Sequence, residues 1–129
     1  MSRALPYLLV GAGGFAGAIA RLLVARWVGV HADTRFPLGI FVINVSGSFL
    51  LGVLATLTAS KAFSNPDAVG LALGVGFLGA FTTFSTFEFD THALLVGGLW
   101  LTAAVNVIAS VLVGLAAVRA GIVVARALS

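Results

Sequence analysis

The feature that most constrains this chain is the spacing of its few charged residues. Asp, Glu, Lys and Arg make up only 9% of its 129 residues. They leave four long stretches without any charge, at residues 4–20, 36–60, 68–87 and 91–118. About 20 apolar residues cross a bilayer as a helix, so each stretch is long enough, provided that the first helix continues past Arg21. The sequence therefore predicts an all-α integral membrane protein with four transmembrane helices.

Turn-forming residues separate the predicted helices. Pro37 is well placed at a helix start, and Asn65-Pro66 and Gly97-Gly98 each mark a turn. We expect one transmembrane domain over residues 1–129, with helices at about 4–30, 37–60, 68–96 and 98–125. No cleavable leader precedes the first apolar run, so we expect that run to be a retained helix.

Composition and charge exclude several classes of function. The chain has no Cys, which removes disulfides, thiolate nucleophiles and zinc sites built on sulfur. His31 and His92 are far apart, and no H-E-x-x-H or paired-acid motif occurs, so we expect no catalytic residue and no enzyme. The net charge is +3, but the basic residues flank apolar runs and therefore favour contact with membrane lipid over contact with nucleic acid.

The third predicted helix contains a dense run of hydroxyl and aromatic side chains. The hydroxyl residues are Thr82, Thr83, Ser85 and Thr86, and they alternate with Phe81, Phe84 and Phe87. Such hydroxyl residues compete for backbone hydrogen bonds and weaken a helix. Two structures are consistent with this run. In one, the helix breaks near residues 79–83, lines a polar cavity and frees carbonyl oxygens that suit a cation. In the other, the helix is continuous and its hydroxyls bond back to its own carbonyls.

Isolated polar side chains also lie within the second and fourth predicted helices. Asn44 is the one strongly polar side chain of the second, and Asn106 and Ser110 share one face of the fourth because they are four residues apart. These groups are neutral donors that an anion can use, and the edge of a phenylalanine ring carries positive quadrupole charge. They are candidates for an anion pathway. The simpler interpretation is hydrogen bonding between helices, worth about 0.6 kcal/mol on average.

Several of the sixteen glycines recur at helical spacing. Gly13 and Gly17 form one G-x-x-x-G pattern, Gly70 and Gly74 form another, and Gly47 and Gly52 lie on the second predicted helix. Small residues let helix backbones approach closely in a membrane, so we expect most of these glycines to serve packing.

The basic residues give little preference for one orientation in the membrane. Four crossings place Arg3, Lys61, Arg119 and Arg126 on one side and at most Arg21, Arg26 and Arg35 on the other. The positive-inside rule needs a clear excess to fix orientation. The balance is consistent with a merely weak preference, or with dual topology, in which the chain inserts both ways and pairs with an inverted copy of itself.

Three sequence blocks resemble the Fluc (CrcB) fluoride channel family. GGFAGAIAR, at residues 13–21, resembles the family's G-G-x-x-G-A-x-x-R. PLGIFVINVSGSFLLG, at residues 37–52, is similar to P-x-G-T-x-x-x-N-x-x-G-S-F-x-x-G. GFLGAFTTFSTFEFDT, at residues 76–91, is similar to G-F-x-G-G-x-T-T-F-S-T-F-S-x-E-T. The TTFSTF core is highly specific, and the resemblance covers nearly the whole chain.

The resemblance implies a fluoride-selective ion channel in the cell inner membrane, built as an inverted homodimer with two fluoride pathways. It places Asn44, Ser110 and the ring pair Phe84 and Phe87 on the pathway. The same resemblance adds Arg21, the hydroxyl run of Thr83, Ser85 and Thr86, and Asn106 and Asp90 as further pathway candidates. It also implies a structural sodium ion on the twofold axis, held by the backbone carbonyls of Gly79 and Thr82 from both subunits.

The chain departs from the family pattern at a few positions. Ile40 replaces a usual Thr, Glu88 replaces a small polar residue, and Asp90 stands where Glu is common. These changes affect the outer ends of the polar track and leave the predicted function in place. The alternative is a small dual-topology transporter coupled to protons or sodium. Small multidrug transporters, which also pair inverted four-helix subunits, depend on a membrane carboxylate in their first helix. In this chain the only charged residues of that helix are Arg21 and Arg26.

Overall fold

The computed structural model describes residues 3–128, and these residues form four apolar spans long enough to cross a membrane. The first two spans are α1 (Leu5–His31) and α2 (Leu38–Ala59). The third is assembled from α3 (Pro66–Val69), the π-helix η1 (Gly70–Leu78), α4 (Gly79–Phe81) and α5 (Phe84–Val96). The fourth is α6 (Trp100–Leu128). The predicted fold class, an all-α membrane protein of four transmembrane helices, is confirmed.

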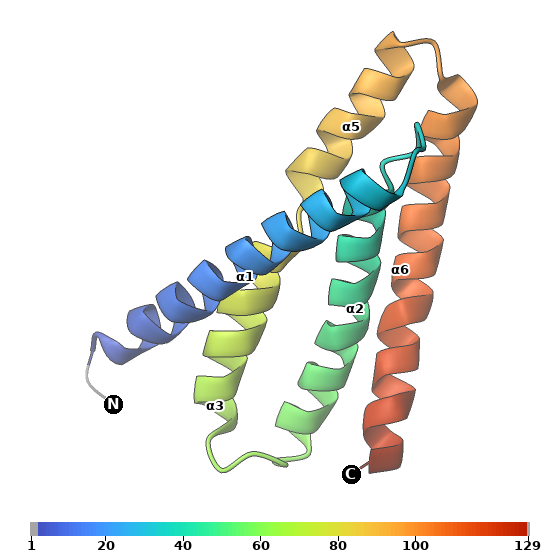
Figure 1. The fold of residues 1–129 in the computed structure, drawn as a ribbon. Coiled ribbons are helices and arrows are strands. Elements are labelled where there is room, and N and C mark those ends of the chain that lie inside the picture. Colours follow the sequence, from blue (N-terminus) through green and yellow to red (C-terminus); the bar gives the residue numbers. More distant parts are fainter. Residues whose placement is uncertain (1–2, 129) are drawn as a thin grey trace.

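The spans alternate in direction, and α1 is inclined across the others (Figure 1). The segments α2 and α6 run side by side and form the most extensive helix pair, and α1 packs mainly on η1. Both ends of the chain lie toward the same end of the bundle (Figure 1), as an even number of crossings requires. The protein is therefore a multi-pass membrane protein.

Glycines set the distance between the closest helices. A Cβ atom on Gly17 would collide with the Phe77 carbonyl of η1, and one on Gly13 would collide with the Ala72 carbonyl. Between α2 and α6, a Cβ on Gly52 would meet the Val118 carbonyl. The predicted packing role of Gly13, Gly17 and Gly52 is confirmed. Gly70 contacts nothing within 4 Å of its Cβ position, so the second G-x-x-x-G pattern does not mark a close helix contact inside the subunit.

The interior of one subunit is small. Ile43 and Asn106 are the largest fully buried side chains among the described residues. Many large apolar side chains are exposed on the single subunit, including Leu101, Leu112 and Phe84. In a membrane such a surface contacts lipid or another subunit without the cost that water would impose.

The third span is broken near its middle, which decides between the two structures that its sequence allows. Thr82 and Thr83 have extended backbone, with φ/ψ of −81°/158° and −152°/120°. The helix that ends at Phe81 therefore restarts at Phe84 in a new direction (Figure 1). Non-helical backbone at this depth needs partners for its amide and carbonyl groups, and these partners define the candidate site.

Candidate functional site at the helix break

A groove with a volume of about 390 Å³ lies beside the break. Its walls come from α2, the third span and α6. The polar and aromatic residues that line it are Asn44, Ser48, Thr82, Thr83, Phe84, Phe87 and Ser110. The groove brings together predicted pathway residues that are as far as 66 positions apart in the sequence, from Asn44 to Ser110.

The Asn44 side chain holds the break in place. Its Nδ2 donates a hydrogen bond to the Thr83 carbonyl at 3.0 Å, and its Oδ1 accepts one from the Thr83 N–H at 2.9 Å. The Asn44 amide therefore pairs with both the N–H and the carbonyl of Thr83, which has no helical hydrogen-bond partners at the break. An Asn amide carries two N–H donors, so one remains for a ligand in the groove.

Hydroxyl groups gather where α5 begins. The Thr83 Oγ1 accepts a hydrogen bond from the Thr86 N–H at 3.3 Å, which caps the helix. The same oxygen lies 3.1 Å from the Thr86 hydroxyl and 3.4 Å from the Ser85 hydroxyl. The three hydroxyls form one neutral cluster at the positive end of the α5 dipole, where negative charge is favoured.

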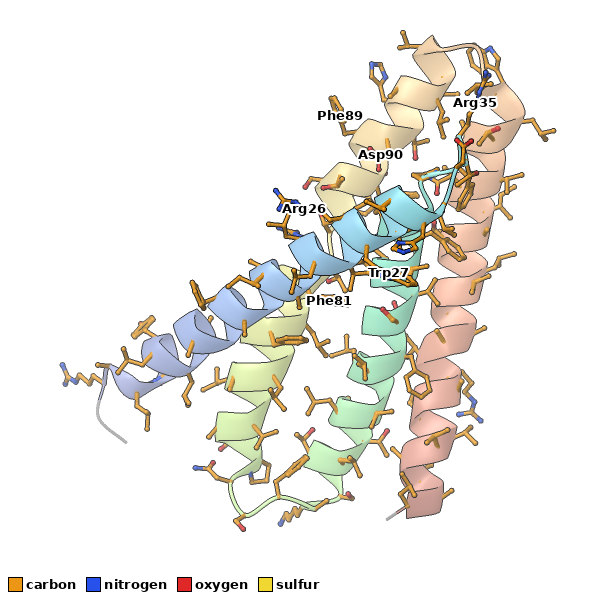
Figure 2. The ribbon with its side chains drawn as sticks, in the orientation of Figure 1. Arg26, Trp27, Arg35, Phe81, Phe89 and Asp90 are labelled. Atoms are coloured by element: carbon orange, nitrogen blue, oxygen red, sulfur yellow. The ribbon has the colours of Figure 1, made fainter. Side chains whose placement is uncertain are left out.

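Two phenylalanines form an aromatic wall of the groove. The Phe84 and Phe87 ring centroids are 5.8 Å apart, with an angle of 41° between the planes. Phe87 is buried, whereas Phe84 is 74% exposed on the single subunit. Phe81 lies before the break and is not among the groove residues (Figure 2). It is buried and stacks on Phe77. Both rings of the Phe84–Phe87 pair line the groove, and they are tilted relative to each other.

Carbonyl oxygens at the break suit a monovalent cation. In a continuous helix the Thr83 N–H would donate to the Gly79 carbonyl, but here it donates to Asn44 instead. The Thr82 carbonyl faces outside the helical ladder and accepts a hydrogen bond from Arg21 Nη1 at 3.5 Å. Gly79 and Thr82 both line the groove. Neutral oxygens of this kind are the ligands that hard cations prefer, so this donor set fits sodium better than a transition metal.

The comparisons with known proteins agree with this architecture. The family model of the CrcB-like proteins, described as "Camphor Resistance (CrcB)", matches residues 8–122. The chain belongs to the CrcB-like family. The resemblance drawn from the three sequence blocks is thereby confirmed.

Named relatives are similar to the chain over most of their length. The fluoride-specific ion channel FluC of Solibacter usitatus is 45% identical, over 93% of this chain and 98% of the relative. FluC 2 of Moorella thermoacetica is 44% identical, over 84% of this chain and 87% of the relative. FluC of Geobacter metallireducens is also 44% identical, over 88% and 90%. Each is named a fluoride-specific ion channel.

Not every candidate from the sequence lies in the groove of this CrcB-like protein. Arg21 approaches from α1, and its Nη1 donates to the Thr82 carbonyl. Asp90 lies farther along α5, in a separate cavity that Arg35 of the α1–α2 loop also lines (Figure 2). Asn106 is 1% exposed and therefore points into the subunit interior. The predicted track thus divides into a central groove, an outer cavity and a buried amide.

Two polar residues near the groove were not predicted from the sequence. Ser48 lines the groove, one helical turn after Asn44, and its hydroxyl donates to the Asn44 carbonyl at 2.7 Å. Thr91 lies one turn after Phe87 and is the hydrogen-bond partner of Asn106. The four-residue spacing from Asn44 and from Phe87 is the signal that could have found them.

Proposed function

We propose that this protein forms a fluoride-selective channel that lets fluoride leave the cell passively across the cytoplasmic membrane. The observation that carries the proposal is a groove lined by neutral donors and two phenylalanine rings, in a chain whose relatives are named fluoride-specific channels. A negative interior pushes an anion outward by about 2.3 kcal/mol per 100 mV. Such a channel reduces fluoride toxicity without chemistry or an energy source, so we propose no enzymatic activity.

In this proposal the groove exchanges water ligands of fluoride for protein donors. The free N–H of Asn44 and the Ser110 hydroxyl supply hydrogen bonds, and the edges of Phe84 and Phe87 supply positive quadrupole charge. None of these groups carries a full charge, so none binds the ion tightly enough to hold it. Conduction requires that balance between entry and release.

We propose that an inverted second copy of this chain completes the groove. Phe84 is 74% exposed on one subunit although it lines the groove, which fits a residue that a partner covers. The near balance of basic residues on the two sides allows both orientations. Lipid then surrounds the dimer on its remaining apolar surface.

A sodium ion at the twofold axis of that dimer would be held by the Gly79 and Thr82 carbonyls of both subunits. Bound there, it would supply a positive centre that joins the two helix breaks. Asn44 and Arg21 prepare the site by holding the Thr83 and Thr82 backbone in non-helical geometry. Thr82→Ser should preserve the site because the ligand is a backbone atom.

Fluoride efflux from liposomes tests the proposed function. Purified protein is reconstituted with potassium fluoride inside, and release is followed with a fluoride electrode after a potassium ionophore is added. The channel predicts rapid efflux that does not depend on the direction of a sodium or proton gradient. Rates that follow either gradient would instead support a coupled transporter, and no efflux would support a protein without transport activity.

A further inference from the structure

Asn106 is the one polar side chain among the described residues that is both large and fully buried, at 1% exposure. An amide in such a position loses its water and must find partners inside the protein. Its Nδ2 donates to the Thr91 Oγ1 at 2.9 Å, which joins α6 to α5. Its Oδ1 accepts a hydrogen bond from the Ser110 hydroxyl at 3.4 Å.

These bonds belong to a longer series of linked hydrogen bonds, and the direction of donation is fixed at one end of that series. The Thr91 hydroxyl donates its single hydrogen to the Phe87 carbonyl at 2.7 Å, and a carbonyl can only accept. Thr91 must therefore accept from Asn106, which turns the Asn106 carbonyl toward Ser110. Ser110 is then the donor in its bond to Asn106.

The two ends of this series line the groove, whereas its two middle members do not. Phe87 and Ser110 are groove residues on α5 and α6. The helices α5 and α6 are joined at the Gly97-Gly98 turn and diverge from it toward the break (Figure 1). A bond between Asn106 and Thr91 thus fixes the separation of two groove walls at a level where the turn no longer does.

The bonds in the series differ in length, which gives them different roles. Those of Thr91, at 2.7 and 2.9 Å, have ordinary hydrogen-bond lengths, whereas the Ser110 bond of 3.4 Å is long for two oxygens. A hydroxyl rotates about its C–O bond to suit its acceptor. Ser110 can therefore turn its hydrogen from Asn106 to an anion in the groove at small cost, while the Asn106–Thr91 link stays intact.

We propose that Asn106 and Thr91 are positioning residues that link α5 to α6 and hold the Ser110 hydroxyl ready to donate to a passing anion. This inference rests on the proposed function for the identity of the anion. In this proposal Asn106 does not touch the anion. It orients the Ser110 hydroxyl and, through Thr91, the turn of α5 that contains Phe87.

The test compares three variants with wild type in fluoride efflux, with rates normalised to the amount of folded dimer. Thr91→Val keeps the side-chain shape and removes the hydroxyl, whereas Thr91→Ser keeps the hydroxyl. Thr56→Val is the matched control, because the Thr56 hydroxyl also bonds a carbonyl four residues back but serves only its own helix. We expect Thr91→Val to lower the rate at least about fivefold, because it leaves the buried Asn106 N–H without an acceptor, which costs more than exchanging one hydrogen bond for another. Thr91→Ser and Thr56→Val should stay within about twofold of wild type.

A double mutant separates positioning from general destabilisation. If Thr91 acts through Ser110, then Thr91→Val should cost less in a Ser110→Ala background than in wild type, because coupled residues are not additive. Losses that simply multiply would overturn the proposal. An unchanged rate in Thr91→Val at equal dimer content would overturn it as well.

Hydrogen exchange gives a readout that does not depend on fluoride. Thr91→Val and Asn106→Leu should speed amide exchange in residues 84–96, and Thr56→Val should not. Unchanged exchange in both variants would contradict the link between α5 and α6. A wild-type protein without fluoride efflux but with this exchange pattern would refute the proposed function and leave the link standing.

Discussion

Asn44 offers the sharpest perturbation of the helix break. Asn44→Ala removes the donor to the Thr83 carbonyl and the acceptor of the Thr83 N–H together. If both backbone groups stay unpaired, each costs about 1–3 kcal/mol, so the variant loses about 2–6 kcal/mol of stability. If they find other partners, the two lost bonds cost only about 1 kcal/mol, from an average near 0.6 for each bond between membrane helices. The break leaves no neighbouring turn to supply those partners, so we expect the larger range.

Thermal melting of the dimer in detergent measures this loss, and efflux measures its consequence. Ser46→Ala is the matched control on the same helix, because the Ser46 hydroxyl donates only to the Ile43 carbonyl at 3.2 Å. We expect Asn44→Ala to melt well below both wild type and Ser46→Ala, with little fluoride flux. Equal melting of Asn44→Ala and Ser46→Ala would refute the role of Asn44 at the break.

Asn44→Asp distinguishes the role of Asn44 in fluoride conduction from its role in stabilising the fold. A carboxylate still accepts the Thr83 N–H, but it cannot donate and carries the same charge as fluoride. We expect fluoride flux to stop near neutral pH in dimers that still assemble. Wild-type flux in a well-folded Asn44→Asp dimer would remove Asn44 from the pathway.

Three further predictions concern the aromatic wall, the cation and the orientation. Phe84→Leu and Phe87→Leu keep much apolar volume but remove the ring quadrupole, so fluoride efflux should fall while the dimer survives. Phe81→Leu is the control. Loss of the dimer in both groove variants would favour a packing role for Phe84 and Phe87. Sodium should raise the melting temperature of the wild-type dimer, and Thr82→Ser should retain that stabilisation because the proposed ligand is a backbone atom. A melting temperature indifferent to sodium in wild type would refute the cation site. Reporter fusions at the C-terminus should report both orientations, and a single orientation for all copies would contradict dual topology.

The spans and the weak point of the third helix could be predicted because they depend on local sequence. Uncharged length alone fixes the four crossings, and the run of Thr82, Thr83, Ser85 and Thr86 marks where the helix is poorest. The sequence alone did not decide between a broken and a continuous third helix. The break is stabilised by Asn44, which is 39 residues away from Thr83. A contact over that distance depends on how α2 and the third span pack.

Two further features were not predicted, one because helix geometry changes along the chain and one because burial depends on how the helices pack. Gly70 and Gly74 have the spacing of a packing motif, but they lie in a π-helix, where hydrogen bonds join residues five apart and the four-residue face is lost. Gly76 takes the close contact instead, against the Val10 carbonyl of α1. Asn106 has the periodicity of Ser110, yet burial separates them, because α5 covers Asn106 and leaves Ser110 on the groove.

The reversal potential of a fluoride current tests the central claim most directly. Reconstituted protein in a planar bilayer is given a tenfold fluoride gradient, with equal sodium and equal pH on both sides. A passive fluoride-selective channel predicts a current that reverses at about 59 mV in magnitude, the equilibrium value for one monovalent ion. Repeating the measurement with a sodium or pH gradient should leave that potential unchanged. A potential that moves with either gradient, or no current at all, would contradict the account.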